Sequence, residues 1–178
     1  VSSARPRIAE YPFTTLHPQL GVVDVGESAG FVMADIPGLI AGAADGVGLG
    51  IDFLKHLSRT RILVHLVDVA PLDGDDLAVT VRDIERELAA FSPDLARRER
   101  WLVLNKCDLL EDEALDKVRE ALVEDLGWVG KVHCLSAATG ENCRELTNAL
   151  MQRLQELDAA ESDQAAGEDQ ASKEDSSS

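Results

Sequence analysis

The sequence has few of the features that mark membrane-spanning, secreted or nucleic-acid-coating proteins. No apolar run approaches the ~18 to 20 residues that a bilayer span requires, and the first ten residues lack the charged and apolar regions of a secretory signal. Only 17 lysines and arginines accompany 33 aspartates and glutamates, so the net charge of −16 opposes bulk attraction to a phosphate backbone. We therefore expect no membrane contact and a cytoplasmic location.

Cysteine is also scarce. Cys107, Cys134 and Cys143 form an odd set without paired metal-ligand spacing, which favours reduced thiols in a core or helix.

With 178 residues, 45% of them hydrophobic, the chain can bury one core but hardly two. The segment 158–178 has one lysine among many acidic residues and no large apolar side chain, which predicts a disordered acidic tail. A solubilising role for this tail is favoured over partner binding.

Short apolar runs alternate with helical periods through the rest of the chain. Two β-rich runs around a glycine-containing segment predict a hairpin, and nearly continuous apolar runs predict strands covered on both faces. The predicted strands are 20–25, 31–34, 62–69, 101–104 and 131–135; the predicted helices are 77–88, 115–126 and 146–157. This order predicts a three-layer α/β fold with a mostly parallel sheet and one antiparallel hairpin strand.

Polar residues follow three of these strands, at the sheet edge where ligands of such folds bind. Asn105, Lys106, Cys107 and Asp108 follow the run 101–104. The Asp108 carboxylate could accept from N1–H and the N2 amine of guanine, a donor pair that adenine lacks. Lys106 could lay its methylenes on the base, and Asn105 could bridge neighbouring loops. The alternative is that Asn105 and Asp108 only cap turns.

The other two strand ends carry weaker signals. Small residues from Ser136 to Gly140 could bring backbone N–H groups to the O6 of guanine, or could form an ordinary helix N-cap. Asp35 could hold Mg²⁺, with Gly38 close to a terminal phosphate, or both could belong to a plain turn. Asp68 also ends a strand, where loop capping is the expected role, and His65 is expected to be a satisfied core histidine.

The order of these elements, a threonine-bearing loop, Asp-x-x-Gly, Asn-Lys-x-Asp and Ser-Ala-Ala, is that of the small GTPase domain of P-loop NTPases. The chain most closely resembles the Obg family of GTPases, through YPFTTL at 11–16, ADIPGLI at 34–40 and GVGLG at 46–50. The likeness covers 1–157. It favours a mobile switch segment at 42–50 over a dinucleotide fingerprint, because no strand directly precedes those glycines.

The resemblance implies particular roles for these residues. Thr15 and Asp35 would bind Mg²⁺, and a monovalent cation such as K⁺ could assist. The implied GTP-binding residues are Phe13, Thr14, Thr15, Leu16, His17, Asp35, Ile36, Pro37, Gly38, Asn105, Lys106, Cys107, Asp108, Ser136, Ala137 and Ala138. Leu39 stands where Ras-type GTPases keep a water-orienting glutamine, so we assign no catalytic base.

A phosphate cradle of the form Gly-x-x-x-x-Gly-Lys-Ser/Thr is absent from the sequence. In the family it lies just upstream of a helix whose end resembles residues 1–5. We therefore expect the chain to be an N-terminally truncated GTPase domain, with a gap in the sheet before strand 62–69 and weak nucleotide binding.

The resemblance implies a monomeric GTPase that acts in assembly of the large ribosomal subunit, with that subunit or its RNA as partner. A non-hydrolysing interaction module with a GTPase-like fold is the alternative. Retention of Thr15, Asp35 and Gly38 favours the enzyme, and Asp108 disfavours an ATPase.

Overall fold

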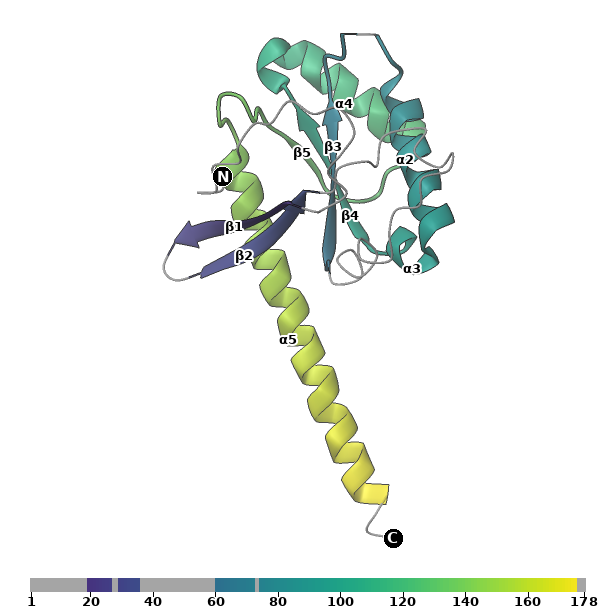
Figure 1. Cartoon of the computed structure of the whole chain (residues 1–178), viewed down its shortest axis with the longest axis vertical. Helices are drawn as coiled ribbons and strands as arrows, with labels where there is room; N and C mark the ends of the chain where they lie inside the picture. Colours follow the sequence, from purple (N-terminus) through teal and green to yellow (C-terminus); the bar gives the residue numbers. More distant parts are fainter. Residues whose placement is uncertain (1–18, 27–28, 36–59, 73, 176–178) are drawn as a thin grey trace.

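The computed structural model describes residues 19–26, 29–35, 60–72 and 74–175 (Figure 1). The predicted strands and helices are confirmed, and two short helical turns add to them. In chain order the elements are β1 (Gln19–Gly26), β2 (Ala29–Asp35), β3 (Ile62–Asp68), α2 (Leu77–Phe91), α3 (Pro93–Ala96), β4 (Glu99–Asn105), η1 (Cys107–Leu109), α4 (Asp112–Leu126), β5 (Val132–Cys134) and α5 (Cys143–Asp175). None of the described helices is both long and apolar enough to cross a bilayer.

The strands form two sheets. β1 and β2 pair antiparallel, which confirms the predicted hairpin, while β3, β4 and β5 form a parallel sheet in that order. Within the described residues no strand joins the hairpin to the parallel strands, so β1 and β2 form a separate sheet and not an edge of the parallel one. The register of β3 and β4 places Asp68 beside Asn105, at the same end of the sheet.

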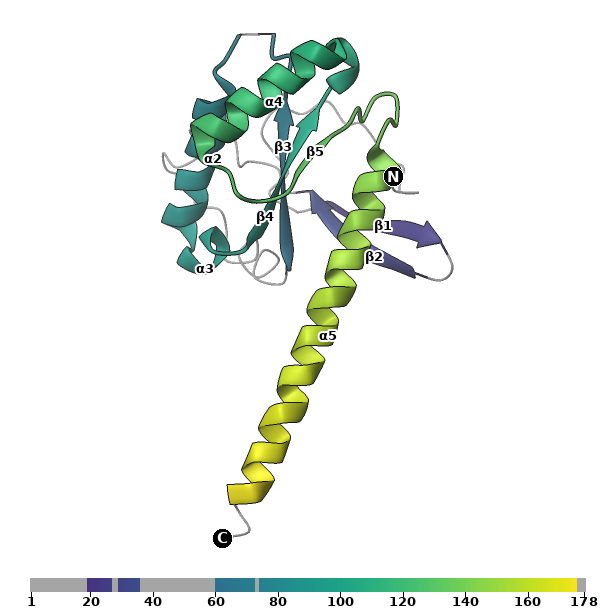
Figure 2. The same ribbon diagram turned by 180° about the vertical axis from the view of Figure 1, so that it is seen from behind.

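β4 is the centre of the core. Trp101, Leu102, Val103 and Leu104 are all buried, because successive residues of a strand point to opposite faces and both faces are covered here. Leu102 and Leu104 pack in the cluster that contains side chains of α2 and α4, and Trp101 and Val103 pack against α5. Figures 1 and 2 show α2 and α4 on one face of the parallel sheet and α5 on the other.

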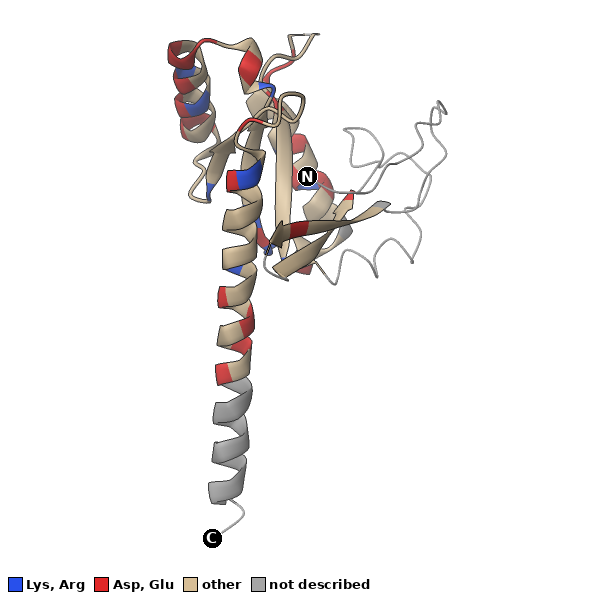
Figure 3. Ribbon diagram, turned by 90° about the vertical axis from the view of Figure 1, so that its left-hand side faces the viewer, with Lys and Arg blue, Asp and Glu red and all other residues tan. Residues whose placement is uncertain are grey.

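The expectation of a disordered tail is not met, since α5 continues through 158–175. Alanine, glutamate and glutamine are abundant there and have high helix propensity. Arg61, just before β3, forms ion pairs with Asp158 and with Glu161, the latter at 2.7 Å. These contacts join the start of the extension to the sheet, and Figure 3 shows acidic residues along the described part of the helix.

Candidate functional site

Asn105 joins two of the predicted site segments. Its side-chain Oδ1 accepts a hydrogen bond from the backbone N–H of Ala137 at 2.9 Å. Two backbone bonds run alongside it: Cys107 N–H donates to the Leu135 carbonyl at 3.1 Å, and Leu135 N–H donates to the Leu104 carbonyl at 2.9 Å. The structure therefore brings the segments 105–108 and 136–138 together.

Lys106 occupies a sharp turn between β4 and η1. Its backbone is left-handed, with φ 67° and ψ 32°, and its ammonium lies 2.5 Å from Asp68 Oδ2. The other carboxylate oxygen of Asp68 accepts the N–H of Ala70 at 2.9 Å, so the predicted loop-capping role is present. The hydrogen bond with Lys106 lowers the pKa of Asp68 and keeps it ionised. Sequence reasoning missed this ion pair, although Asp68 ends β3 and Lys106 directly follows the neighbouring strand β4.

Asp108 presents an open carboxylate. The residue is exposed, and within the described part of the chain no hydrogen bond or ion pair engages it. The preceding residue, Cys107, is instead buried, and its thiol donates to the Leu104 carbonyl at 3.2 Å. Burial raises the pKa of Cys107 to about 11, so this thiol stays protonated and packs as a core group.

Ser136 shapes the second segment. The residue is fully buried, and its hydroxyl oxygen and carbonyl accept the N–H groups of Thr139 and Gly140 at 3.1 and 2.9 Å. These bonds close a tight turn. They do not cap a helix, because α5 begins only at Cys143. Asn105 accepts the Ala137 N–H. Within the segment 136–140, the N–H of Ala138 is therefore the backbone donor that has no partner among the described residues.

The predicted metal and phosphate contacts are only partly placed. Asp35 is exposed at the end of β2, and no hydrogen bond or ion pair within the described ranges joins it to 105–108 or 136–138. No group of three or more histidine, cysteine, aspartate or glutamate residues in those ranges could hold a metal ion. The remaining predicted residues lie outside the described part: Phe13, Thr14, Thr15, Leu16, His17, Ile36, Pro37 and Gly38.

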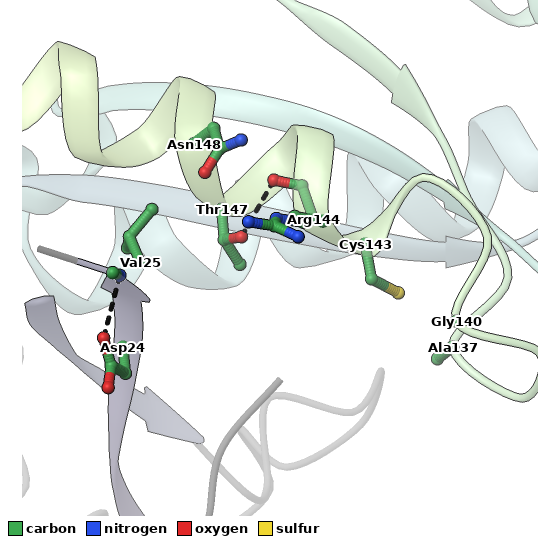
Figure 4. Close-up of a pocket in the computed structure, with 9 residues that line it drawn as sticks. Asp24, Val25, Ala137, Gly140, Cys143, Arg144, Thr147 and Asn148 are labelled. Atoms are coloured by element: carbon green, nitrogen blue, oxygen red, sulfur yellow. Dashed lines mark hydrogen bonds between the residues drawn. The ribbon is translucent and has the colours of Figure 1, made fainter.

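A surface cavity of about 560 Å³ lies next to the 137–140 loop (Figure 4). The end of β1, the loop and the first turns of α5 line it. Of the predicted site residues it includes Ala137, but neither Asp35 nor Asp108. Its lining residues are Asp24, Val25, Gly26, Ala137, Gly140, Cys143, Arg144, Thr147 and Asn148.

His65 differs from the expected satisfied core histidine. Its Nδ1 is buried and has no hydrogen-bond partner in the part of the chain that the structure describes. Burial, with a smaller contribution from nearby Arg100, lowers the pKa of His65 to about 4. The imidazole is therefore neutral at physiological pH and acts as a packing group.

Comparison with known proteins identifies a family. A family model described as 50S ribosome-binding GTPase matches residues 1–106. The protein "GTPase Obg" from each of two strains of Acidithiobacillus ferrooxidans is 54% identical over 160 residues, which cover 90% of this chain and 43% of the relative. The chain thus spans less than half the length of these curated relatives.

A solved structure supports the fold independently. It is described as a nucleolar GTP-binding protein 1 from Plasmodium falciparum, and it superposes with a TM-score of 0.53 at 14% identity. The match covers 84% of this chain and 75% of that one. Because the identity is low, this likeness bears on the α/β fold alone. The family match, which covers more than half of the sequence, shows that the chain belongs to the family of 50S ribosome-binding GTPases.

Proposed function

We propose that this protein binds GTP and GDP and hydrolyses GTP to GDP and phosphate, in assembly of the large ribosomal subunit. The observation that carries guanine recognition is the Asn105 to Ala137 hydrogen bond, which holds two strand-end segments together, while the exposed Asp108 carboxylate has no partner in the described ranges. The family match and the relatives named GTPase Obg support the hydrolytic part.

In this proposal the Asp108 carboxylate selects the base. Asp108 would accept hydrogen bonds from N1–H and the N2 amine of guanine, and the Ala138 N–H, which has no partner in the described part of the chain, would donate to O6. Adenine offers a bare N1 acceptor in the same place, so the carboxylate would lose both partners on desolvation. A site of this kind rejects the wrong base strongly, because it leaves a charged group unpaired.

Of the residues proposed to hold a magnesium ion, Asp35 alone lies in the described ranges, and its donor type fits the ion. Asp35 is an exposed carboxylate at a strand end without a partner in the described ranges, and Mg²⁺ prefers such oxygen ligands. Asp35 and Thr15 are the residues that would hold it. When bound, the ion would neutralise charge that develops on the phosphates, and K⁺ would add to that effect. Leu39 cannot orient water, so positioning rather than a base would carry the reaction.

The remaining parts of the proposal concern partners. The net charge of −16 disfavours bulk attraction to RNA, so contact with the large ribosomal subunit or its RNA would use a restricted surface. A cytoplasmic monomer is the form in which we expect the protein to act. The alternative is a non-hydrolysing interaction module with a GTPase-like fold, which a measurement of phosphate release would distinguish from the enzyme.

The test of base recognition is a titration of the chain with GDP, ADP and xanthosine diphosphate, followed by backbone amide NMR. The wild-type chain should prefer GDP over ADP, with shifts at 105–108 and 136–138. Asp108→Asn should lose that preference and gain affinity for xanthosine diphosphate, because an amide can donate to the 2-oxo group. Glu120→Gln, the same charge change at an exposed helix position, is the control. Equal shifts with GDP and ADP in the wild-type chain would refute guanine recognition.

Hydrolysis needs a separate experiment. Phosphate release from GTP, measured on a chain extended upstream, should depend on Mg²⁺ and rise with K⁺ or ribosomal particles. Absence of release under all of these conditions would favour the non-hydrolysing module, and competition by ATP as strong as by GTP would favour an ATPase.

A further inference from the structure

We infer that Asp68 is a positioning residue of the guanine site, holding Lys106 so that its methylene stem forms a fixed platform for the base. The inference rests on the proposed function. It starts from the register of the parallel sheet, which places Asp68 of β3 beside Asn105 of β4. Lys106 is the next residue, so its ammonium can reach the neighbouring strand end, where it lies 2.5 Å from Asp68 Oδ2.

The carboxylate of Asp68 is itself held in place. Oδ1 accepts the N–H of Ala70 at 2.9 Å within its own loop, which leaves Oδ2 directed to Lys106. One side chain thus closes the turn after β3 and binds the lysine after β4. An acceptor with an anchored oxygen fixes its partner better than one that rotates freely, since less conformational entropy remains to be lost.

Lys106 is held at both ends. Its backbone lies in the left-handed region, which is strained for a residue with a Cβ atom and persists only where surrounding contacts enforce it. Those contacts are the Asn105 bond to Ala137 and the Cys107 bond to Leu135. With the α-carbon fixed by the turn and the ammonium by Asp68, the stem keeps few rotamers before a nucleotide arrives, which is preorganisation.

The ion pair contributes little to the stability of the fold. The side chains of Lys106 and Asp68 are 44% and 36% exposed, and exposed pairs are worth at most about 1 kcal/mol. Because the Asp68–Lys106 pair joins the ends of β3 and β4 at the proposed site and adds little to core stability, its loss should affect nucleotide binding more than folding. Removing it should therefore leave the chain folded and weaken nucleotide binding by about fivefold, which is what about 1 kcal/mol corresponds to.

The test compares Asp68→Asn with the wild-type chain in the same titration. Asparagine keeps an oxygen for the Ala70 N–H and removes only the charge that Lys106 needs. We expect GDP and inosine diphosphate to lose affinity by the same factor of about five, because the platform contacts the base face and not its edge. The NMR signal of the Lys106 ammonium should broaden as its hydrogen bond is lost. Asp68→Glu, which keeps the charge, should restore part of the affinity.

Asp83→Asn is the matched control, since it removes the same charge from an ion pair with Arg86 on α2. If Asp68→Asn binds GDP as the wild-type chain does, the role of Asp68 is overturned while guanine recognition stands. If Asp68→Asn does not fold, Asp68 is structural and the inference is also wrong. A wild-type chain without preference for GDP over ADP would remove the proposed function and this inference together.

Discussion

Replacing Asn105 by alanine tests the bond that joins the two site segments. The change removes the oxygen that accepts the Ala137 N–H at 2.9 Å. Ala137 is exposed, so water can replace the lost partner and the net cost should be about 1 kcal/mol, not the larger penalty of a buried orphan group. The effect should be local: protection of the Ala137 amide from hydrogen exchange should fall by about fivefold.

Amide hydrogen exchange followed by NMR measures this directly, and urea unfolding gives the global change. Asn105→Asp keeps an accepting oxygen and should retain the protection of Ala137 despite its added charge. Asn148→Ala removes an exposed asparagine on α5 whose side chain has no hydrogen bond among the described residues, and it should change neither measurement. An unchanged Ala137 exchange rate in Asn105→Ala would refute the account of the site.

Three further changes test the core and the helix extension. Stability should decrease as the pH falls from about 6.5 to about 4, because the unfolded chain binds a proton at His65 that the folded chain excludes; urea melts of His65→Leu should show a weaker pH dependence. Leu102→Ala should lower the free energy of unfolding by about 2 to 5 kcal/mol, whereas the exposed Val79→Ala should have little effect. Arg61→Ala should reduce the helical circular dichroism signal by releasing Asp158, and the difference should vanish in about 1 M salt; an equal signal in dilute buffer would contradict this role.

Most elements could be predicted from the sequence because their signals are local. The nearly continuous apolar run of β4 requires cover on both faces, and the spacing of leucines along α4 and α5 requires one buried stripe. The hairpin followed from two β-rich runs around glycines. The tail was the exception, since its composition fits both a solvated coil and an exposed helix. The ion pairs of Arg61 with Asp158 and Glu161, at the start of the helix extension, join residues 97 and 100 positions apart, and no local pattern indicates them.

The sequence by itself determined which residues stand at the strand ends, and so the motif 105–108 and its expected chemistry. Only the tertiary structure decided which of these groups are engaged and which are open. Asn105 accepts the Ala137 N–H and Lys106 pairs with Asp68, because the register of β3, β4 and β5 sets those neighbours. Asp108 has no partner among the residues that the structure describes. Periodicity along a chain carries no information about such pairings, since they depend on which strands lie side by side.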